Sequence, residues 1–283
     1  MQVLRRPGAL SAAVERLKRR GTVGFVPTMG ALHEGHLSLV RLAHRECDGV
    51  VASIFVNPTQ FGPKEDLARY PRPFAKDRRL LARASTDILF APSVADIYPR
   101  GFQTRVSVEK LAKPLCGRTR PVHFAGVATV VLKLLNLVRP DRLYLGQKDY
   151  QQWRLVEQMA LDLDLPVKVR RAPIVREPDG LAMSSRNVFL SQAERTQAPA
   201  LYRTLKEAAQ RVREGRRDPR RLAADLKRFL KAEAPAARID YLEIVDARTL
   251  ENVLKLKKGK QIAVALAAYF SKARLIDNIL IKV

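Results

Sequence analysis

The sequence predicts an α/β protein with a Rossmann-like parallel sheet, helices on both faces of that sheet, and a smaller α+β C-terminal domain. Short apolar runs alternate with helical patterns through the first half of the 283-residue chain. Polar motifs follow several of these runs, where the carboxyl ends of parallel strands would lie. After roughly Ile174, two amphipathic basic segments precede three strand-like runs, which is typical of an α+β domain.

The first half is expected to contain repeated strand–helix–strand units. The first unit has a strand at Thr22–Val26, a helix at Glu34–Glu46 with apolar residues at helical spacing, and a strand at Val50–Val56. Its crossover should be right-handed. Three more helices are predicted, each followed by a strand: Phe74–Ala84 and Ile88–Phe90, Phe124–Leu137 and Arg142–Leu145, Tyr150–Leu161 and Val167–Arg170.

The second half has a different pattern. Two helices are predicted, at Ser191–Arg213 and Pro219–Ala234, joined by a polar link that contains Gly215. Three strands are expected to follow, at Ile239–Val245, Gln261–Phe270 and Leu275–Val283. We therefore predict two domains, spanning residues 1–175 and 176–283.

The net charge of +24 is unusual. It suggests a polyanionic partner, either nucleic acid or a phosphate-rich substrate. The alternative is a solvated surface rich in lysine and arginine. The basic residues are spread along the chain, and no basic stretch is interleaved with aromatic residues as in an RNA-binding sheet. We therefore favour the solvated surface and expect no nucleic-acid partner.

Neither a membrane segment nor a secretory peptide is predicted. No stretch approaches the roughly 20 apolar residues that a membrane helix needs. The N-terminal segment Met1–Gly21 scatters basic residues among apolar ones and has no apolar signal core. The two cysteines, Cys47 and Cys116, are far apart and show no CxxC spacing. A disulfide framework or a zinc site is therefore not expected, and a cytoplasmic location fits.

The segment Pro27–His36 carries two of the four histidines, His33 and His36. It lies where the first strand ends and the first helix begins, which is where ligands bind in a parallel α/β sheet. A helix N-terminus favours phosphate, and the i, i+3 spacing puts both imidazoles on one face. There they can donate hydrogen bonds to charge that grows during phosphoryl chemistry. Gly30 and Gly35 allow backbone to approach a nucleotide closely. The alternative is a pair of structural histidines that cap the helix.

This HxGH motif resembles that of the nucleotide-α-phosphate-attacking superfamily, which includes class I aminoacyl-tRNA synthetases and small nucleotidylyltransferases. By itself it implies adenylyl transfer and no particular acceptor. Further segments narrow the resemblance to the pantothenate synthetase family, which it follows from about Thr22 to Val283. These segments are Phe55–Pro63, Tyr70–Arg72, Arg120–Pro121 with His123–Phe124, Gly146–Gln152, Met183–Asn187 and Arg274–Asn278.

The resemblance implies a two-step ligase reaction. The carboxylate of pantoate attacks the α-phosphorus of ATP, which releases pyrophosphate and forms pantoyl adenylate. The amine of β-alanine then attacks the acyl carbon, giving pantothenate and AMP. Residues 1–175 would bind ATP and pantoate, and residues 176–283 would close over ATP as a lid that excludes water from the acyl adenylate. A homodimer formed through the first domain is also implied.

The resemblance assigns three segments to ATP. The first is Met29, Gly30, Ala31, Leu32, His33, Glu34, Gly35 and His36, with His36 as proton donor. The second is Gly146, Gln147, Lys148 and Asp149, for which a solvated turn is the alternative. The third is Val175 with Met183, Ser184, Ser185 and Arg186. We expect catalytic roles for His33, His36, Lys148 and Arg186, whose side chains can stabilise phosphate oxygens.

Pantoate is implied to be held by Gln60 and Gln152, with Gln60 also meeting β-alanine. A neutral amide can orient a carboxylate by hydrogen bonds, whereas an arginine would hold the nucleophile in a tight ion pair. Val130 and Val131 are implied to form an apolar wall beside pantoate. Surface amides and ordinary helix core are the alternatives for these residues.

Mg²⁺ is expected as a cofactor, held mainly by phosphates and waters, so no protein metal site is predicted. Asp77 is a possible outer ligand, but an acid on a helix surface is the favoured interpretation. Val122 and Ser271 stand where the family usually has glycine, and we expect them to affect substrate affinity rather than activity.

Two rival functions are weighed. A nucleotidylyltransferase of the same superfamily would leave AMP on its product, but the smaller members usually lack a second domain with a segment like Met183–Asn187. A nucleic-acid-binding module is suggested by the charge alone.

Overall fold

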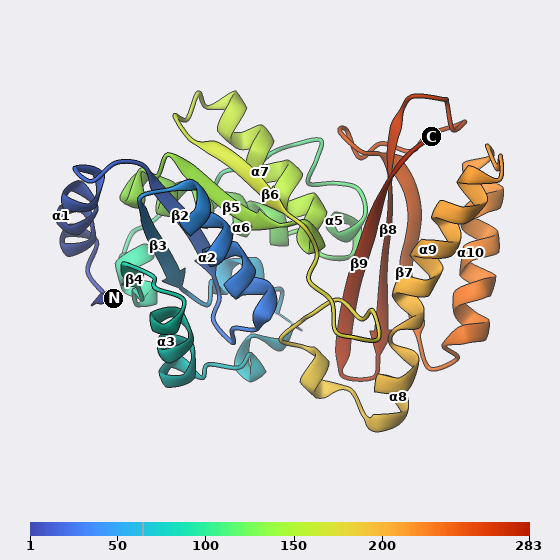
Figure 1. Ribbon diagram of the computed structural model, residues 1–283, viewed down its shortest axis with the longest axis horizontal. Helices are drawn as coiled ribbons and strands as arrows, with labels where there is room; N and C mark the ends of the chain where they lie inside the picture. The colour runs from blue at the N-terminus through green and yellow to red at the C-terminus, as the bar shows by residue number, and fades with distance from the viewer. Residues whose placement is uncertain (64) are drawn as a thin grey trace. The chain divides into compact units, whose positions relative to one another are not determined.

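Figure 1 shows a computed structural model of the chain, in which residues 1–63 and 65–283 are described. They form two compact units. The first comprises residues 1–112, 120–147 and 152–173, and the second comprises residues 113–119, 148–151 and 174–283. The expected division of the chain into an ATP- and pantoate-binding domain, residues 1–175, and a lid domain, residues 176–283, stays a prediction.

The first unit is built on a six-stranded sheet in the order β1-β4-β3-β2-β5-β6. All of its strand pairs are parallel, which confirms the predicted class. The order reverses between β2 and β5, so the carboxyl ends of these two strands flank a topological switch point. The strands are β1 (Gln2–Leu4), β2 (Val23–Thr28), β3 (Gly49–Ile54), β4 (Ile88–Phe90), β5 (Arg142–Gly146) and β6 (Lys168–Ala172).

Helices cover both faces of this sheet. Because side chains of a strand alternate between faces, Val26 and Phe25 of β2 point in opposite directions. Val26 packs with Leu39 and Val40 of helix α2, while Phe25 is equally inaccessible on the other face, where α6 contacts β2. The helices of the first half are α1 (Pro7–Lys18), α2 (Glu34–Glu46), α3 (Phe74–Arg83), α4 (Val94–Ile97), α5 (Cys116–Thr119), α6 (His123–Val138) and α7 (Tyr150–Asp162), with 3-10 turns η1 (Pro58–Gln60), η2 (Asp66–Arg69) and η3 (Gln147–Asp149).

Strand β1 and helix α1 were not part of the sequence prediction. Leu10, Val14 and Leu17 of α1 are buried at helical spacing. Pro7 stands in the first turn, where its missing N–H costs nothing. The scattered basic residues of this segment occupy the remaining faces and obscured the pattern.

Residues 174–283 of the second unit contain a three-stranded antiparallel sheet in the order β7-β8-β9 and three helices, as the α+β class predicts, and the short helix α5 also belongs to this unit. One prediction is wrong: Ser191–Arg213 is two helices rather than one. Pro199, the residue before α9, has no N–H to donate, so the preceding helix ends before it. The elements are η4 (Asn187–Phe189), α8 (Gln192–Gln197), α9 (Ala200–Arg213), α10 (Pro219–Glu233), β7 (Arg238–Asp246), β8 (Gln261–Phe270) and β9 (Ala273–Lys282).

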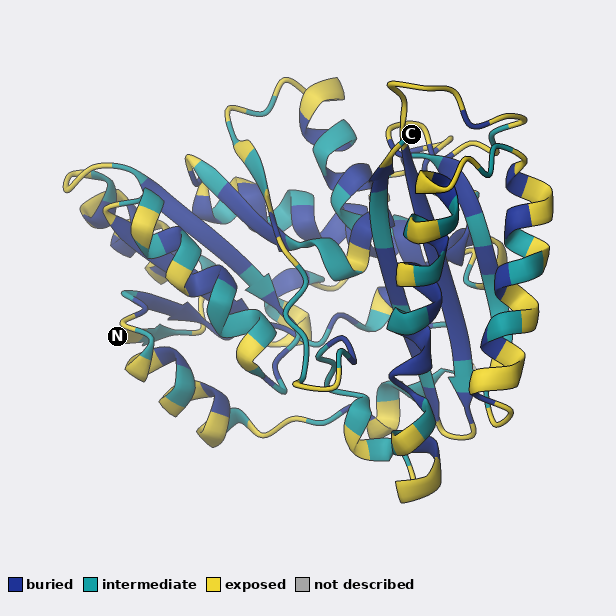
Figure 2. Cartoon of the chain, turned by 45° about the vertical axis from the view of Figure 1, so that its right-hand side comes forward, coloured by how far each residue is buried: buried dark blue, intermediate teal, exposed yellow. Residues whose placement is uncertain are grey.

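The core of the second unit lies between its sheet and helices α9 and α10. Strand β8, the central strand, is buried along most of its length (Figure 2), and Leu205 of α9 and Leu226 of α10 are inaccessible to solvent. The Asp218 carboxylate caps α10 by accepting hydrogen bonds from the Arg220 and Arg221 amides, at 2.9 and 3.1 Å. Among the described residues, no helix is long and apolar enough to cross a membrane.

The two positions that depart from the family pattern fit their local structure. Ser271 has φ +25°, in the region that favours glycine. Its hydroxyl donates to the Glu194 carboxylate at 2.5 Å, and Glu194 in turn caps the first turn of α8 through Ser191. Val122 precedes α6 with φ −87° and ψ −15°, which any residue adopts. An effect of either residue on substrate affinity remains a prediction.

Candidate active site

Three sequence motifs begin at the carboxyl ends of three neighbouring strands in the first unit. Strand β2 leads into Met29–His36, β3 into Phe55–Pro63, and β5 into Gly146–Gln152. Because β3, β2 and β5 are adjacent and parallel, these ends meet along one edge of the sheet. This is the position at which open α/β sheets bind their ligands.

The loop between β2 and α2 is held by a buried carboxylate. Asp77 of α3 is 1 % exposed. One of its oxygens accepts from the Ala31 amide at 2.8 Å and the other from the Leu32 amide at 2.9 Å. Gly30 and Ala31 have φ values of +81° and +51°, and this left-handed conformation costs energy at the alanine. Asp77 therefore stabilises a strained turn just before the two histidines.

The interpretation of Asp77 as a helix-surface acid is wrong, because the carboxyl is buried and faces the loop. Its helical spacing from Phe74 and Leu81 places it on the inward face of α3. Both oxygens are committed to backbone N–H groups, so the outer metal ligand also considered for it does not fit this arrangement. Burial raises the pKa of the Asp77 carboxyl above 3.8, although the hydrogen bonds from Leu32 and Ala31 oppose the rise.

His33 and His36 lie together at the start of α2. The ring centroids are 4.0 Å apart. His36 Nδ1 accepts from the His33 backbone N–H at 3.3 Å, so this imidazole does take part in capping. A neutral His36 that accepts at Nδ1 carries its proton on Nε2. The capping interaction therefore leaves Nε2 as a donor, and capping and catalysis are compatible roles for this residue.

Gln60 is buried and is fixed by its neighbours in the first unit. Its side-chain oxygen accepts from Asn57 Nδ2 at 3.2 Å, and its amide nitrogen lies 2.9 Å from the Met29 sulfur. Its backbone carbonyl accepts from Arg120 at 3.2 Å and from His123 Nδ1 at 2.9 Å. The structure thus brings Gln60 beside the first ATP motif and explains the matching residues at positions 120 and 123.

Helix α6 approaches the Gln60 turn closely. A Cβ atom on Gly126 would lie 2.4 Å from the Thr59 carbonyl oxygen and 2.7 Å from the Gln60 Cα, so only glycine fits. Val130 and Val131 follow on the same helix and are 6 and 5 % exposed. Both are buried, as either a substrate wall or helix core requires.

Arg120 is itself held by Glu65. Arg120 Nε and Nη2 donate to the two Glu65 oxygens at 2.8 and 2.6 Å. Burial raises the pKa of the Glu65 carboxyl, but the hydrogen bond and charge of Arg120 outweigh it, so the net shift is downward. Glu65 is therefore ionised at neutral pH and keeps Arg120 pointed at Gln60.

The β5 motif divides between the two units after Gln147. In the second unit, the Lys148 carbonyl accepts from Asn278 Nδ2 of β9 at 3.0 Å. Lys148 Nζ lies 3.6 Å from the Asp149 carboxylate. Gln151 donates to the Pro114 carbonyl at 2.7 Å and accepts from the Cys116 amide at 3.1 Å. These bonds give Gln151 a structural role.

Gln152, the glutamine assigned to pantoate, belongs to the first unit and is half-buried on α7. The resemblance assigned pantoate to Gln152 and gave its neighbour Gln151 no role. The contacts of Gln151 within the second unit give it a structural role, and the role of Gln152 stays a prediction.

The third segment that the resemblance assigns to ATP forms a compact turn in the second unit. The Met183 amide donates to the Val175 carbonyl at 3.0 Å, so these two residues of the segment are direct neighbours. The Arg186 amide donates to Ser184 Oγ at 3.2 Å. Asn187 Nδ2 donates to Glu177 at 2.7 Å and to the Ala182 carbonyl at 3.2 Å, which closes the turn.

A buried ion pair ties this turn to β9. Arg176 donates to the two Asp277 oxygens at 2.6 and 3.0 Å, and Asp277 is 2 % exposed. The neighbouring Asn278 holds the Lys148 carbonyl, so two adjacent residues of β9 hold both of the second-unit segments that the resemblance assigns to ATP. Neither Asn278 nor Asp277 was assigned a role from the sequence, although both lie in the matching segment Arg274–Asn278.

Replacing Arg176 with methionine is expected to lower the free energy of unfolding of the second unit by about 3–5 kcal/mol, because it leaves a buried carboxylate unpaired. Burial already raises the pKa of Asp277 above 3.8, against the opposing effect of Arg176. The folded state thus binds this proton more tightly than the unfolded state, so the contribution of Asp277 falls as pH rises through its folded pKa.

Loss of Arg176 should raise that pKa further, and the variant should regain part of its stability on acidification. Urea unfolding of the full chain at several pH values measures this difference. Arg176→Lys keeps the positive charge but loses the paired hydrogen bonds of the guanidinium group. Its free energy of unfolding should lie between those of the wild type and Arg176→Met. A deficit in Arg176→Met that did not shrink at low pH would contradict the expectation.

No group of three or more His, Cys, Asp or Glu side chains in the described ranges is arranged to hold a metal ion. Both cysteines, Cys47 and Cys116, are free thiols.

Comparison with known proteins places this geometry in a family. The family model described as pantoate-beta-alanine ligase matches residues 2–280. The chain is 55 % identical over 264 residues to the pantothenate synthetase of Thermotoga neapolitana, with 93 % of each chain covered. It is 49 % identical over 283 residues to that of Caldicellulosiruptor bescii, covering 100 % of this chain and 99 % of the relative.

Solved structures agree. A crystal structure of the pantothenate synthetase of Thermus thermophilus superposes with a TM-score of 0.92 at 48 % identity, covering 99 % of both chains. The pantoate-beta-alanine ligase of Francisella tularensis, complexed with beta-gamma ATP and beta-alanine, superposes with a TM-score of 0.81 at 37 % identity, covering 99 % of this chain and 97 % of that one. The chain belongs to the pantoate–β-alanine ligase family.

Proposed function

We propose that this chain condenses pantoate with β-alanine at the expense of ATP, through a pantoyl-adenylate intermediate. A pantoate carboxylate oxygen attacks the α-phosphorus and the bond to pyrophosphate breaks. The β-alanine amine then attacks the acyl carbon, loses a proton, and the bond to AMP breaks. The observation that carries this proposal is the match to one ligase family over residues 2–280, with its motifs at three adjacent strand ends.

ATP is bound in this proposal by Met29–His36, Gly146–Asp149, Val175 and Met183–Arg186. His36 donates from Nε2 to a phosphate oxygen as negative charge grows there, and its cap bond at Nδ1 fixes the tautomer that can do so. His33, Lys148 and Arg186 add donors and positive charge. In this proposal, residues 176–283 act as a lid that excludes water from the acyl adenylate.

Pantoate is oriented by Gln60 and Gln152, with its dimethyl group against Val130 and Val131, and Gln60 also meets β-alanine. The held position of Gln60 supports this assignment, since a residue held through both its side-chain oxygen and its backbone carbonyl can orient a nucleophile at low entropic cost.

Mg²⁺ is proposed as the cation of ATP, bound by phosphate oxygens and water, because the described residues offer no cluster of ligands for it. It would offset negative charge on the triphosphate. The free thiols fit a reducing cytoplasm. A homodimer formed through residues 1–175 completes the proposal, and sedimentation at several protein concentrations would test it.

The test of the proposed reaction is the dependence of AMP release on both acceptors. With ATP, Mg²⁺ and pantoate, pyrophosphate should appear to about one equivalent per site and AMP should not be released. Adding β-alanine should start continuous release of both products. A product that retains AMP covalently would instead show nucleotidyl transfer.

A further inference from the structure

A groove with a volume of about 740 Å³ lies between α2 and α3 of the first unit. This is the size of pockets that bind small molecules, about 300–1,000 Å³. None of the residues assigned to ATP, pantoate or β-alanine lines it. Its walls come from one face of α2, from the end of α3 and from the two residues after α3, namely Leu37, Arg41, His44, Arg45, Leu80, Arg83, Ala84 and Ser85.

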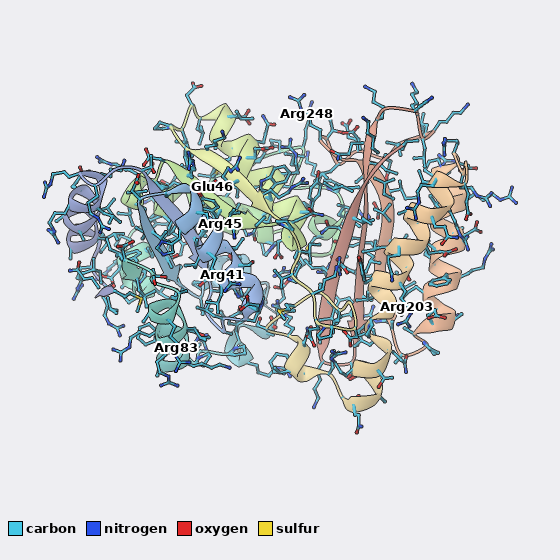
Figure 3. All side chains as sticks on the ribbon, in the orientation of Figure 1. Arg41, Arg45, Glu46, Arg83, Arg203 and Arg248 are labelled. Atoms are coloured by element: carbon cyan, nitrogen blue, oxygen red, sulfur yellow. The ribbon has the colours of Figure 1, made fainter. Side chains whose placement is uncertain are left out.

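The groove is strongly cationic. Figure 3 labels Arg41 and Arg45 one turn apart on α2, and Arg83 on α3. The guanidinium groups of Arg45 and Arg83 have no hydrogen bond or ion pair with any residue of 1–63 or 65–283, and no acidic side chain lines the groove. Arg41 is paired with Glu34. By contrast, Arg203 of α9, also labelled, donates to Glu233 at 2.9 Å.

The helix dipole explains only part of this arrangement. Arg45 and Arg83 stand in the last turns of their helices, where a cation is favourable by about 0.3–1 kcal/mol. Arg16 of α1 and Arg213 of α9 occupy the same kind of position and are not among the residues that line this groove. The dipole thus accounts for a cation at each helix end, but not for three guanidinium groups around one hollow.

His44 adds a second sign of a missing partner. It lines the groove, and its Nε2 is buried with no hydrogen-bond partner in the described part of the chain. A buried polar atom without a partner is costly, so a turn of the His44 ring that brought Nε2 to a ligand in the groove would remove that cost.

The lining also selects among anions. Arginine forks bind phosphate oxygens in pairs, and Leu37, Leu80 and Ala84 offer an apolar floor. No Phe, Tyr or Trp is among the lining residues, so the groove lacks the large stacking platform that single-stranded nucleic acids use. We propose that this groove is a second ligand site, which binds a small organic polyphosphate independently of the substrate ATP.

The site is connected to the candidate active site through Arg41. Its partner Glu34 stands between His33 and Gly35, in the first turn of α2. A ligand that draws Arg41 towards the groove releases Glu34 in the motif that carries the histidines. This connection rests on the proposed function of Met29–His36, whereas binding in the groove does not.

The test uses the full chain, inorganic tripolyphosphate as the probe, and backbone amide resonances as site-resolved reporters. The amides of Arg83, Ala84 and Ser85 should shift saturably, while those of His33 and Gly35 report separately on the proposed triphosphate site. Arg45→Gln/Arg83→Gln should weaken the groove response about 10-fold or more, since it removes two charge-assisted contacts. Glu34→Gln should tighten it a few-fold by freeing Arg41.

The matched control is Arg16→Gln/Arg213→Gln. It removes two last-turn guanidinium groups and lowers the net charge by the same amount, so it should change the groove affinity by less than about twofold. If both double variants weakened the binding equally, general charge attraction would explain it and the proposal would be overturned. The absence of any shift of the groove amides would also overturn it.

Two other results would be decisive. A single-stranded oligonucleotide that shifts the groove amides when tripolyphosphate does not would replace the proposed ligand by nucleic acid. If the groove amides shifted and those of His33 and Gly35 did not, the result would support the second site. It would count only against the proposed ATP site.

Discussion

Replacing His36 with alanine is expected to slow adenylate formation on the order of 10²-fold or more, the usual cost of losing a donor to charge in the transition state. The second step should be affected less when pantoyl adenylate is supplied directly, because its charge develops at the acyl group. Single-turnover release of pyrophosphate and of AMP measures the two steps separately. Equal losses in both would show that His36 does not act on the first step.

Two further substitutions separate the capping role of His36 from its catalytic role. Asparagine places an acceptor near the position of Nδ1, which can keep the bond from the His33 N–H, but it has no group at Nε2. Glutamine reaches further and can place an amide N–H near Nε2. We expect Asn to remain slow and Gln to recover part of the rate. Recovery by Asn would mean that the imidazole serves only to cap the helix.

The sequence predicted the elements that the site depends on, because their apolar patterns are local. Helix α2 begins and ends at Glu34 and Glu46 as predicted, and β4 and β8 have the predicted bounds. A helix N-terminus that follows a parallel strand is recognisable from the strand's apolar run and the polar residues after it. The placement of the histidine motif could therefore be inferred without a structure.

The residues that hold the motifs in place could not be inferred in this way. Asp77 lies more than forty residues from the loop it holds, with one carboxylate oxygen 2.8 Å from the Ala31 amide. Its helical spacing from Phe74 and Leu81 puts it on the inward face of α3, but nothing in the sequence identifies the backbone groups that it contacts. The same is true of Asn278, which holds Lys148 across the second unit. Their partners are backbone N–H and C=O groups, which every residue type except proline carries. The residue types at the two positions therefore do not indicate the contact.

Replacing Asp77 with asparagine is expected to lower kcat/KM for ATP about 10- to 100-fold. The carboxylate accepts two backbone N–H groups, whereas an amide accepts one and turns its own N–H₂ towards the other. The turn at Gly30 and Ala31 loses one of its two restraints, and a displacement of about 1 Å in a positioned group can cost about 10²-fold.

Stability should change less than activity in this variant. Burial raises the pKa of Asp77, so the ionised carboxyl is less favourable in the folded state than in the unfolded one, in spite of its two hydrogen bonds. Its contribution to the free energy of unfolding therefore falls as pH rises through the folded pKa. The buried carboxylate thus orders the loop but lowers the free energy of unfolding. Asparagine carries no charge to bury, so the loss of a hydrogen bond in the variant is partly offset.

The pH dependence distinguishes this positioning role from a general loss of structure. When the wild-type Asp77 takes up a proton, one oxygen becomes a donor and can no longer accept from the loop. Wild-type kcat/KM should therefore fall as pH approaches the raised pKa, while Asp77→Asn, which has no proton to gain, stays low throughout. The ratio of kcat/KM of the wild type to that of Asp77→Asn should therefore shrink on acidification. The control is Asp66→Asn, which changes an acid in η2, and its ratio should not shrink in this way. A ratio that stays constant with pH would mean that the Asp77 charge does not order the loop, and the asparagine effect would then be one of packing alone.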